Sequence, residues 1–370
     1  MRPRIHLRNR LLKAGMSVGR RSVPNGREDN TVKIVDVARA GRVSAATVSR
    51  VLTNSPGVSE ETRKRIRQLM ADLSYHPHDV ARRLATRATR NIMVVGTQTP
   101  GQVYAQPILG ELFGAIEESL RANGYRCTVI SRPDLEQDQM GRRLVKERGV
   151  DGVILIGPRL NDPFVSELLD EGFPSVTIGR SLGLVHACYV DIDNAAGVYS
   201  AVHTLIEMGH RSIAHVCGSL ETTVGIERLE CYRRTLLDAG MEYREDLVIA
   251  GGNSRAVAYA NTIASFRRLV PRPTAVFVFN DYLALAVLRA IRELGLRVPA
   301  DVAVIGFDDE EASSYLDPPL ASVRAPIAEM GRQAVAMVLE QVHGEKIVQP
   351  QVILATDLVL RSSVGPPEST

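Results

Sequence analysis

The sequence predicts an α/β protein in which a small all-helical head precedes a larger body built on parallel sheets. Residues 31–76 carry short apolar stripes at helical spacing, and from residue 91 onward β-rich runs alternate with helical patterns. The chain has 370 residues, of which 45% are hydrophobic. This length predicts two or three domains with cores of their own, since domains usually hold about 100 to 200 residues.

In the head, residues 36–52 read DVARAGRVSAATVSRVL, which predicts two short amphipathic helices joined by a glycine-containing turn. Ser44 is placed to cap the second helix by accepting a backbone N–H. Taken alone, this pattern is compatible with an ordinary αα-hairpin. It is also typical of a helix-turn-helix, whose second helix reads the major groove of DNA.

The charge distribution favours the DNA-binding interpretation. The first ninety residues hold twenty Lys or Arg against seven Asp or Glu, a net charge of +13, whereas the whole chain carries +3. Residues 91–370 therefore carry about −10. A basic head on an acidic body is the electrostatic pattern of a phosphate-binding module joined to a part that does not bind nucleic acid.

A third helix follows, with a cap at Ser59 and an acidic first turn. We expect its apolar residues to close a three-helix core and its basic residues to stay outside. The apolar residues are Ile66, Leu69 and Leu73, and the basic residues are Arg63, Lys64, Arg65 and Arg67.

The second helix and its flanks supply the candidate DNA contacts. Arg50 is the leading candidate for base readout, because a guanidinium bonds guanine O6 and N7 together, worth roughly 1 to 3 kcal/mol of discrimination. Its alternative role is a phosphate clamp. Methyl groups permit close approach or touch thymine, whereas hydroxyl and amide groups position the backbone. The remaining candidates are Ala45, Ala46 and Ser49, with Ser44, Thr47 and Asn54 as backbone positioners.

Composition and motifs exclude several other classes of protein. Four cysteines without paired spacing predict buried thiols in a reducing cytoplasm. No stretch approaches the roughly 18 apolar residues of a membrane span, and the Arg-rich start lacks the apolar core of a signal peptide. We therefore expect a cytoplasmic protein with no membrane partner.

The sequence also lacks the motifs of common enzyme and cofactor sites. Phosphate-loop, dinucleotide-binding, zinc-protease and nucleophile-elbow motifs do not occur, so we expect neither an enzyme nor a cofactor. The spacing of His203, His210 and His215 predicts surface or core histidines, not metal ligands.

In the body, strand-helix alternation predicts parallel sheets in two open lobes. Several predicted helices stop at a glycine, which supplies the left-handed conformation of a helix end. These glycines are Gly124, Gly209, Gly240 and Gly295. The predicted strands are 92–96, 127–130, 153–156, 175–178, 213–217, 275–279 and 302–305.

Over these motifs the chain resembles the LacI/GalR family of bacterial repressors, from about residue 31 to the terminal LVLRSS. The resemblance implies a periplasmic-binding-protein-like body that crosses three times between its lobes. It also implies an effector between the lobes and a homodimer on a pseudo-palindromic operator. The matching stretches are DVARAGRVSAATVSRVL, VSEETRKRI, YHPHDVARRLAT, VDIDNAAG, MGHRSIAHVCG, FNDYLALAVLRAIRELGLRVPADVAVIGFDD and PPLASVRAP.

The resemblance identifies residues 77–90 as the family's hinge helix and linker. Leu84 stands where the family inserts a leucine between base pairs in the minor groove, with Arg82 beside it as a DNA contact. A helix this short is marginal in isolation, so we expect it to order on DNA. His78 replaces the usual asparagine cap, which leaves Asp79 as an alternative cap.

The resemblance also carries the candidate effector contacts. Arg228 and Asp281 match family residues that reach the ligand, although structural pairing or capping is the alternative for both. Ile108 and Leu109 stand where the family often has two aromatics, so the usual stacking surface for a sugar ring is missing. Gly179 before Arg180 replaces an aspartate, which leaves Arg180 as an anion partner or an inter-lobe strut.

These observations predict an effector-controlled DNA-binding regulator, most plausibly a repressor, whose ligand is a sugar or sugar derivative with added weight for an anionic one. The alternatives are a non-sugar effector, control by a protein partner, or a transport-type binding protein, which would have no use for the head. Residues 1–30 are either a disordered basic arm or follow an upstream start codon, with Met16 as the true beginning. The expected domains are the extension at 1–30, the helix-turn-helix at 31–76, the hinge at 77–90, the two lobes at 91–365 and a tail at 366–370.

Overall fold

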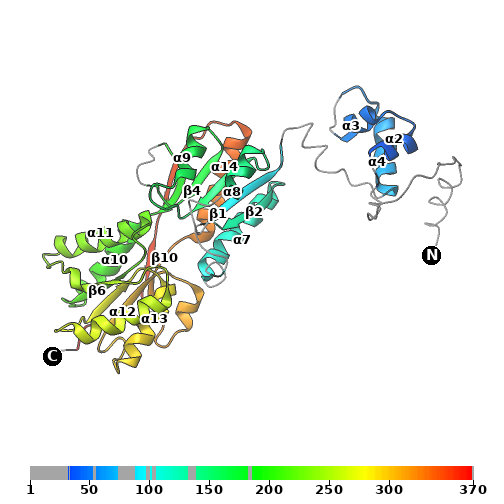
Figure 1. Cartoon of the computed structure of the whole chain (residues 1–370). Helices are drawn as coiled ribbons and strands as arrows, with labels where there is room; N and C mark the ends of the chain where they lie inside the picture. Colours follow the sequence, from blue (N-terminus) through cyan, green and yellow to red (C-terminus); the bar gives the residue numbers. More distant parts are fainter. Residues whose placement is uncertain are drawn as a thin grey trace, which may run out of the picture. The chain divides into compact units, whose positions relative to one another are not determined.

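The computed structural model divides the chain into two compact units, Met1–Arg87 and Ala88–Thr370 (Figure 1). We describe each unit by itself, the first as the head and the second as the body. The described residues are 32, 34–52, 56–73, 88–96, 101, 106–131, 139–181 and 186–368.

The head contains three packed helices, as expected: α2 (Ile34–Gly41), α3 (Ala45–Leu52) and α4 (Glu60–Asp72). Ser44 caps α3 by accepting the Thr47 N–H at 3.1 Å, and Ser59 caps α4 by accepting the Thr62 N–H at 3.3 Å. Both predicted caps are therefore confirmed. The core consists of Val37, Ala38, Val48, Val51, Ile66 and Met70.

The expected inner face of α4 is partly wrong. Arg63 is buried, with 6% of its surface exposed, and Met70 joins Ile66 in the core while Leu69 is only half-buried. Arg63, Ile66 and Met70 lie on one helical face because they are three and four residues apart. The aliphatic stem of Arg63 packs there, while its Nε reaches Glu60 Oε1 at 3.3 Å.

Gly41 and Arg42, in the turn of the helix-turn-helix, have different structural roles. Arg42 has a φ of 49°, in the left-handed region that disfavours residues with a Cβ atom. Gly41 is the last residue of α2, and a Cβ there would meet Ile66 Cδ1 at 2.5 Å. Gly41 is thus required for the close approach of α2 and α4, and Arg42 adopts the strained conformation itself.

The body consists of two lobes, each with a six-stranded sheet. Lobe 1 has the strand order β11-β5-β4-β3-β1-β2 and lobe 2 the order β12-β10-β9-β8-β6-β7. All pairings are parallel except β10 with β12. The strands are β1 (Asn91–Gly96), β2 (Arg126–Ser131), β3 (Gly152–Ile156), β4 (Ser175–Ile178), β5 (Tyr189–Ile192), β6 (Ile213–Cys217), β7 (Val248–Ala250), β8 (Ala275–Val278), β9 (Ala303–Asp308), β10 (Ala321–Arg324), β11 (Gln351–Leu354) and β12 (Asp357–Val359).

Helices cover the two sheets, and the four glycines predicted to end helices all have positive φ. In lobe 1 the helices are α7 (Pro107–Ala122), α8 (Gln139–Lys146), α9 (Pro163–Asp170) and α14 (Ile327–His343). In lobe 2 they are α10 (Asn194–Glu207), α11 (Thr223–Asp238), α12 (Arg255–Arg268) and α13 (Asp281–Glu293), with short 3₁₀ turns η1 (Glu245–Leu247) and η2 (Glu311–Tyr315). No helix among the described residues is long and apolar enough to cross a membrane.

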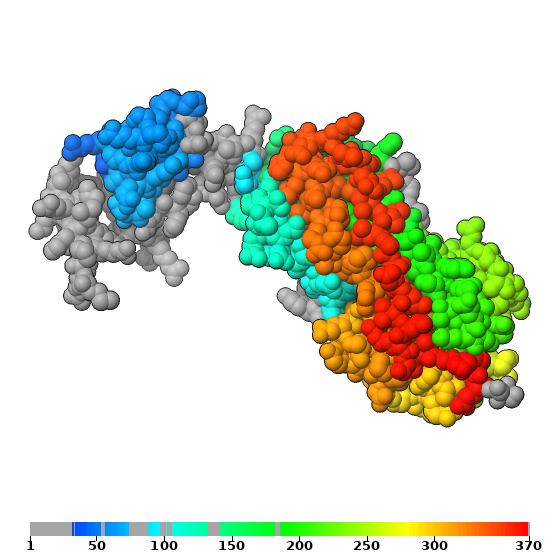
Figure 2. Space-filling view, turned by 180° about the vertical axis from the view of Figure 1, so that it is seen from behind, coloured from blue at the N-terminus to red at the C-terminus, as the bar shows by residue number. Residues whose placement is uncertain are grey.

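The chain passes between the lobes three times, as the family resemblance implied. The crossings follow β5, β10 and β11. The first and third are joined to each other, because Asp193 N–H donates to Leu354 O at 2.8 Å and the Thr356 hydroxyl donates to Asp193 O at 3.2 Å. Figure 2 shows the orange and red C-terminal part of the chain lying over one face of both lobes.

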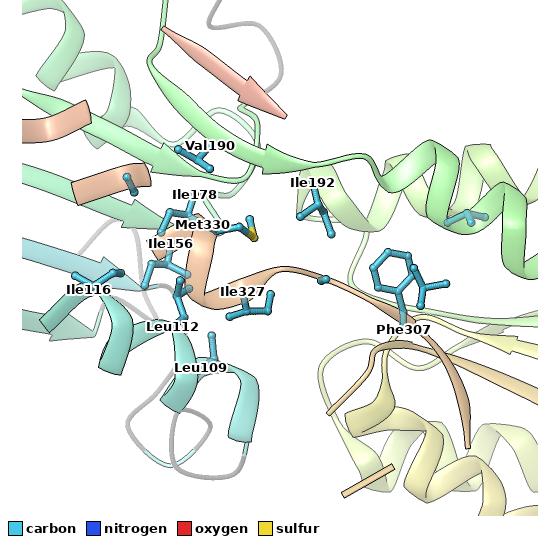
Figure 3. Packing of buried hydrophobic residues seen from close by; sticks show 14 of the residues in the cluster. Leu109, Leu112, Ile116, Ile156, Ile178, Val190, Ile192, Phe307, Ile327 and Met330 are labelled. Carbon is cyan, nitrogen blue, oxygen red and sulfur yellow. The ribbon is translucent and has the colours of Figure 1, made fainter. Parts of the chain in front are cut away.

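A continuous apolar cluster extends from lobe 1 into lobe 2. In Figure 3, Leu109 and Leu112 of α7 point toward the sheet of lobe 1, and Ile192 and Ile327 lie along the crossings toward Phe307 of lobe 2. The two lobes thus share a core at the crossings, and their strand ends face each other beside it.

Candidate functional site

In the head, α3 presents two predicted DNA-contacting residues on one exposed face. Ala46 and Arg50 are one turn apart and both are exposed. Thr47 and Ser49 are half-buried beside them. The exposed Ser44 hydroxyl hydrogen-bonds that of Thr47 at 2.9 Å, which orders the start of the helix.

The other predicted DNA contacts are placed differently. Ala45 is half-buried and packs against the head's core, so less of its methyl group faces outward than the sequence suggested. Asn54, Arg82 and Leu84 lie outside the described residues. The outward face of α3 therefore presents the small methyl group of Ala46 and, one turn later, the long cationic side chain of Arg50.

In the body, the predicted effector residues gather where the carboxyl ends of the two sheets meet. We call this region the inter-lobe junction. From lobe 1 it contains Ile108, Leu160, Arg180 and Asp191, and from lobe 2 it contains Asn194, Glu221, Glu227, Arg228, Phe279, Asp308 and Glu310.

Arg228 occupies the centre of the junction and is 4% exposed. Its Nε donates to Asn194 Oδ1 at 2.9 Å and its Nη1 donates to Phe279 O at 2.6 Å. The guanidinium lies 3.5 Å from the Phe307 ring centre and 4.8 Å from that of Phe279. Backbone, amide and aromatic contacts thus fix the orientation of this cation.

The partner charge of Arg228 is Asp308. Asp308 Oδ1 lies 3.8 Å from Arg228 Nη2, an ion pair too long for a hydrogen bond. Burial raises the pKa of Asp308 well above its usual range, and Arg228 opposes this shift. Burial also lowers the pKa of Arg228, and Asp308 is the main charge that opposes it.

Asp281, the second predicted effector residue, already has three donors from its own chain. Its carboxylate accepts the hydroxyls of Ser313 and Ser322 at 2.6 and 2.7 Å and the Glu310 N–H at 3.0 Å. Burial raises its pKa to about 7, although these hydrogen bonds oppose the shift. A Cβ at Gly306 would overlap Asp281 Oδ1, so glycine makes room for the carboxylate. Effector contact through Asp281 stays a prediction.

Arg180 joins the two lobes. Its Nε donates to Asp191 Oδ2 at 3.1 Å within lobe 1, and its Nη2 lies 3.2 Å from Glu227 Oε1 on α11 of lobe 2. Burial of Glu227 raises the pKa of this carboxyl, and Arg180 is the main opposing charge. Of the two roles open for Arg180 from the sequence, this geometry matches the inter-lobe strut.

Main-chain contacts join the lobes on either side of Arg180. Leu160 N–H of lobe 1 donates to Glu221 O of lobe 2 at 3.0 Å. Burial raises the pKa of the Glu310 carboxyl of lobe 2, and the Ile108 N–H at the start of α7, which faces this carboxyl, opposes the shift. Ile108 is half-buried and Leu109 belongs to the core of lobe 1, so both predicted positions contribute apolar surface.

Comparisons with known proteins agree with this architecture. Residues 33–78 match the model for bacterial regulatory proteins of the lacI family, and residues 202–364 match the periplasmic binding protein-like domain. The HTH-type transcriptional regulator CelR of Thermobifida fusca is 36% identical over 333 residues, which cover 88% of this chain and 96% of that protein. The chain belongs to the LacI family. Catabolite control protein A of Priestia megaterium is 31% identical over 338 residues, covering 90% and 99% of the two chains.

Solved structures support the same conclusion for this LacI-family regulator. A complex of the transcriptional regulator CelR with cellobiose superimposes with a TM-score of 0.71 at 34% identity, covering 90% of this chain and 100% of the other. The lac repressor dimer bound to operator and the anti-inducer ONPF gives 0.79 at 27% identity, covering 90% and 99%. Because these relatives are transcription regulators and not enzymes, the family excludes the catalytic alternative.

Several residues of the regulator's junction were missed by sequence reasoning. Asp191 and Asn194 lie in the matched stretch VDIDNAAG, but neither they nor Glu227 and Glu310 were named as site residues, because only the fold brings them to their partners. Position relative to strands would have found three of them: Asp191 lies in β5, Asn194 begins the helix after it, and Glu310 follows β9. In any open α/β sheet, polar residues at the carboxyl ends of parallel strands are candidate ligand-binding residues.

Proposed function

We propose that this LacI-family regulator represses transcription by binding a pseudo-palindromic operator as a homodimer, and that a neutral sugar at the inter-lobe junction controls this binding. The observation that carries the proposal is the junction itself. Arg228 is held between two phenyl rings at a lobe contact that few hydrogen bonds maintain. A ligand that enters there changes the contact between the lobes, which is the condition for a two-state switch.

The charge balance of the junction supports a neutral ligand and argues against the anionic sugar derivative to which the sequence gave added weight. Arg180 is paired with two carboxylates, and Arg228 has Asp308 as its partner charge. Five carboxyl groups lie in or beside the junction, those of Asp191, Glu227, Asp281, Asp308 and Glu310. A neutral polyhydroxy ligand offers donors to these acceptors, whereas an anion adds repulsion. The CelR relative was solved with cellobiose, a neutral sugar.

A thermal-shift screen tests the effector. We expect at least one neutral sugar among cellobiose, maltose, glucose and galactose to raise the melting temperature by mass action. Gluconate and glucose 6-phosphate serve as matched anions and should give smaller shifts. A sugar that stabilises the protein should also change its DNA affinity, since linkage between two sites is reciprocal. No response to any sugar would favour control by a protein partner.

Fluorescence anisotropy with an inverted repeat from beside the coding region tests operator binding. Arg50→Ala should weaken binding to this fragment about 10- to 100-fold, in keeping with roughly 1 to 3 kcal/mol for a base contact. Lys64→Ala is the matched control, because Lys64 is an exposed cation on a different helix, α4. Its effect should be weaker and independent of sequence. Binding that survives deletion of the first ninety residues would contradict the proposal.

A further inference from the structure

Glu310 stands out among the buried groups of the body that the proposed function has not used. It lies two residues after the end of β9 and directly before η2, and only 8% of its surface is exposed. Its backbone is fixed, because its N–H donates to Asp281 Oδ2 at 3.0 Å. Its carboxylate Oε1, however, is buried and accepts no hydrogen bond from any described residue. A buried acceptor without a donor is costly, and native structures rarely keep one without a reason.

The Glu310 carboxyl lies at the start of α7, and only its Oε1 atom is without a donor. On the side of lobe 1, the Ile108 N–H at the start of α7 faces the carboxyl. The side chain of Gln106, the cap residue of α7, does not cap this helix, and the first turn of the helix has no acidic residue. The positive end of the helix is therefore served by a carboxylate from the opposite lobe.

On the side of lobe 2, the nearest cation is already engaged. Arg255 favours the ionised form of Glu310, but its Nε donates to Tyr282 O at 3.1 Å and its guanidinium lies 4.0 Å from the Tyr282 ring centre. The remaining ionisable neighbours, Asp281 and Asp308, are carboxyl groups that also accept and do not donate when ionised. Oε1 thus needs a donor that the described chain does not supply.

We propose that Glu310 is an effector-binding residue that sets specificity: Oε1 accepts a hydrogen bond from a hydroxyl of the bound sugar, and the same carboxylate ties that sugar to the start of α7. This inference rests on the proposed function and assigns it a further contact. The hydroxyl satisfies the orphan acceptor, so binding removes a cost that the free protein carries. Since the contact spans both lobes, it forms fully only when they are together.

The specificity follows from the sign of the charge. A carboxylate beside Asp281 and Asp308 rewards a hydrogen-bond donor and rejects a second anion. Glu310 should therefore discriminate between a neutral sugar and the matching uronic acid, which keeps the ring and differs from the sugar at one carbon. A purely structural carboxylate that only caps α7 would not affect this ratio.

Calorimetric titration of the full chain tests the proposal with Glu310→Ala, Glu310→Gln and the control Glu311→Gln. Glu311 is the exposed neighbour on η2, so its variant makes the same charge change outside the site. The probe is whichever of cellobiose, maltose, glucose or galactose binds the wild type most tightly, together with the uronic acid of the same sugar. We expect Glu310→Ala to weaken sugar binding at least tenfold and Glu311→Gln to stay within twofold. Glu310→Gln should reduce the preference for sugar over acid at least fivefold.

Amide hydrogen exchange at the start of α7 gives a second measurement that does not depend on affinity alone. Sugar should slow exchange there in the wild type, and in Glu310→Ala at saturating sugar this slowing should be lost. Wild-type sugar affinity in Glu310→Ala, or an unchanged preference for sugar over acid in Glu310→Gln, would overturn the role of Glu310 and leave the proposed function standing. If no sugar binds the wild type, the sugar effector and the role of Glu310 both fail.

Discussion

The two lobes of the body share one strand order but differ in the chemistry at the ends of their strands. β3 and β4 of lobe 1 occupy the positions that β8 and β9 occupy in lobe 2. β3 and β4 lead into Gly157 and Gly179, whereas β8 leads into Phe279 and β9 ends at Asp308. The same architecture therefore carries glycines on one side and an aromatic and a carboxylate on the other.

This difference teaches which lobe determines what is bound. Lobe 2 buries most of the ionisable groups at the junction and holds them with serine hydroxyls, Asn194 and main-chain atoms. Lobe 1 contributes apolar surface at α7, main-chain contacts and the pair of Arg180 with Asp191. We infer that lobe 2 determines which ligand is bound, whereas lobe 1 supplies the contacts that bring the two lobes together around it. The buried ionisable groups of lobe 2 include His210, His215, Arg228, Asp281, Asp308 and Glu310.

Removing the central cation of lobe 2 should have the largest effect. Arg228→Ala leaves Asp308 without its partner, and breaking a buried pair in this way costs about 3 to 5 kcal/mol. Arg180→Ala, in which a side chain that is 31% exposed is lost, should cost about 1 kcal/mol or less. Calorimetric unfolding at one protein concentration measures both. Equal losses for the two arginines would remove the energetic difference between the lobes.

The acid side of the stability profile should depend on two buried histidines of lobe 2, His210 and His215, because burial lowers the pKa of both. His215 is buried between Tyr232 and Phe277, and burial lowers its pKa from 6.5 to about 4. Between these values the unfolded chain binds more protons at this histidine, so the contribution of His215 to the free energy of unfolding falls as the pH drops from 6.5 to 4. Buried Asp281, whose pKa is raised to about 7, contributes in the opposite direction. The loss from His215 approaches about 3 kcal/mol, at 1.36 kcal/mol for each pKa unit.

His215→Phe keeps an aromatic ring in this position and removes the titration. The variant should therefore lose less stability than the wild type between pH 6.5 and pH 4, as followed by urea unfolding at each pH. An acid-side slope identical to that of the wild type would show that other groups cause the dependence.

A glycine in lobe 2 should tolerate substitution less than one in lobe 1. Gly306→Ala forces a methyl group against Asp281 Oδ1, and overpacking of this kind costs about 1 to 3 kcal/mol. The change should also disturb the hydrogen bonds from Ser313 and Ser322. Denaturant unfolding measures the loss, and a neutral result would mean that Asp281 moves without cost.

The smallest expected effect is a gain in lobe 1. Gly110 lies within α7, and a Cβ there would meet nothing within 4 Å. Gly110→Ala should stabilise the protein by about 0.5 to 1 kcal/mol, because alanine loses less backbone entropy in a helix than glycine. A decrease in melting temperature would indicate that this face of α7 is covered in solution.

Local patterns were sufficient to predict most of the fold. Uniform apolar runs predicted the central strands, and the glycine stops at Gly124, Gly209, Gly240 and Gly295 were confirmed by their positive φ. Short edge strands such as β7 and β12, with three residues each, are too brief to show a period, so they were missed. Arg63 was misplaced because its helical position, more than its charge, determines its burial.

The site was predictable only as single residues. Arg228 and Arg180 were named from the sequence, but their partners were not. Arg228 meets Phe279 51 residues away, and Arg180 meets Glu227 47 residues away. Such contacts depend on how the sheets bring distant strand ends together, and no periodic pattern along the chain encodes them. The same limit applies to Asp281, whose serine donors lie 32 and 41 residues away and gave no signal in the sequence.

The bonded pair of crossings between the lobes has a mechanical consequence. Because the Asp193 backbone is joined to both Leu354 and Thr356, two of the three connecting strands act as a single stiff ribbon. Twisting or sliding one lobe past the other would break those bonds, whereas bending about the ribbon preserves them. The connection therefore favours hinge rotation of one lobe against the other, so that a ligand binding at the lobe edge far from the ribbon would turn the whole lobe.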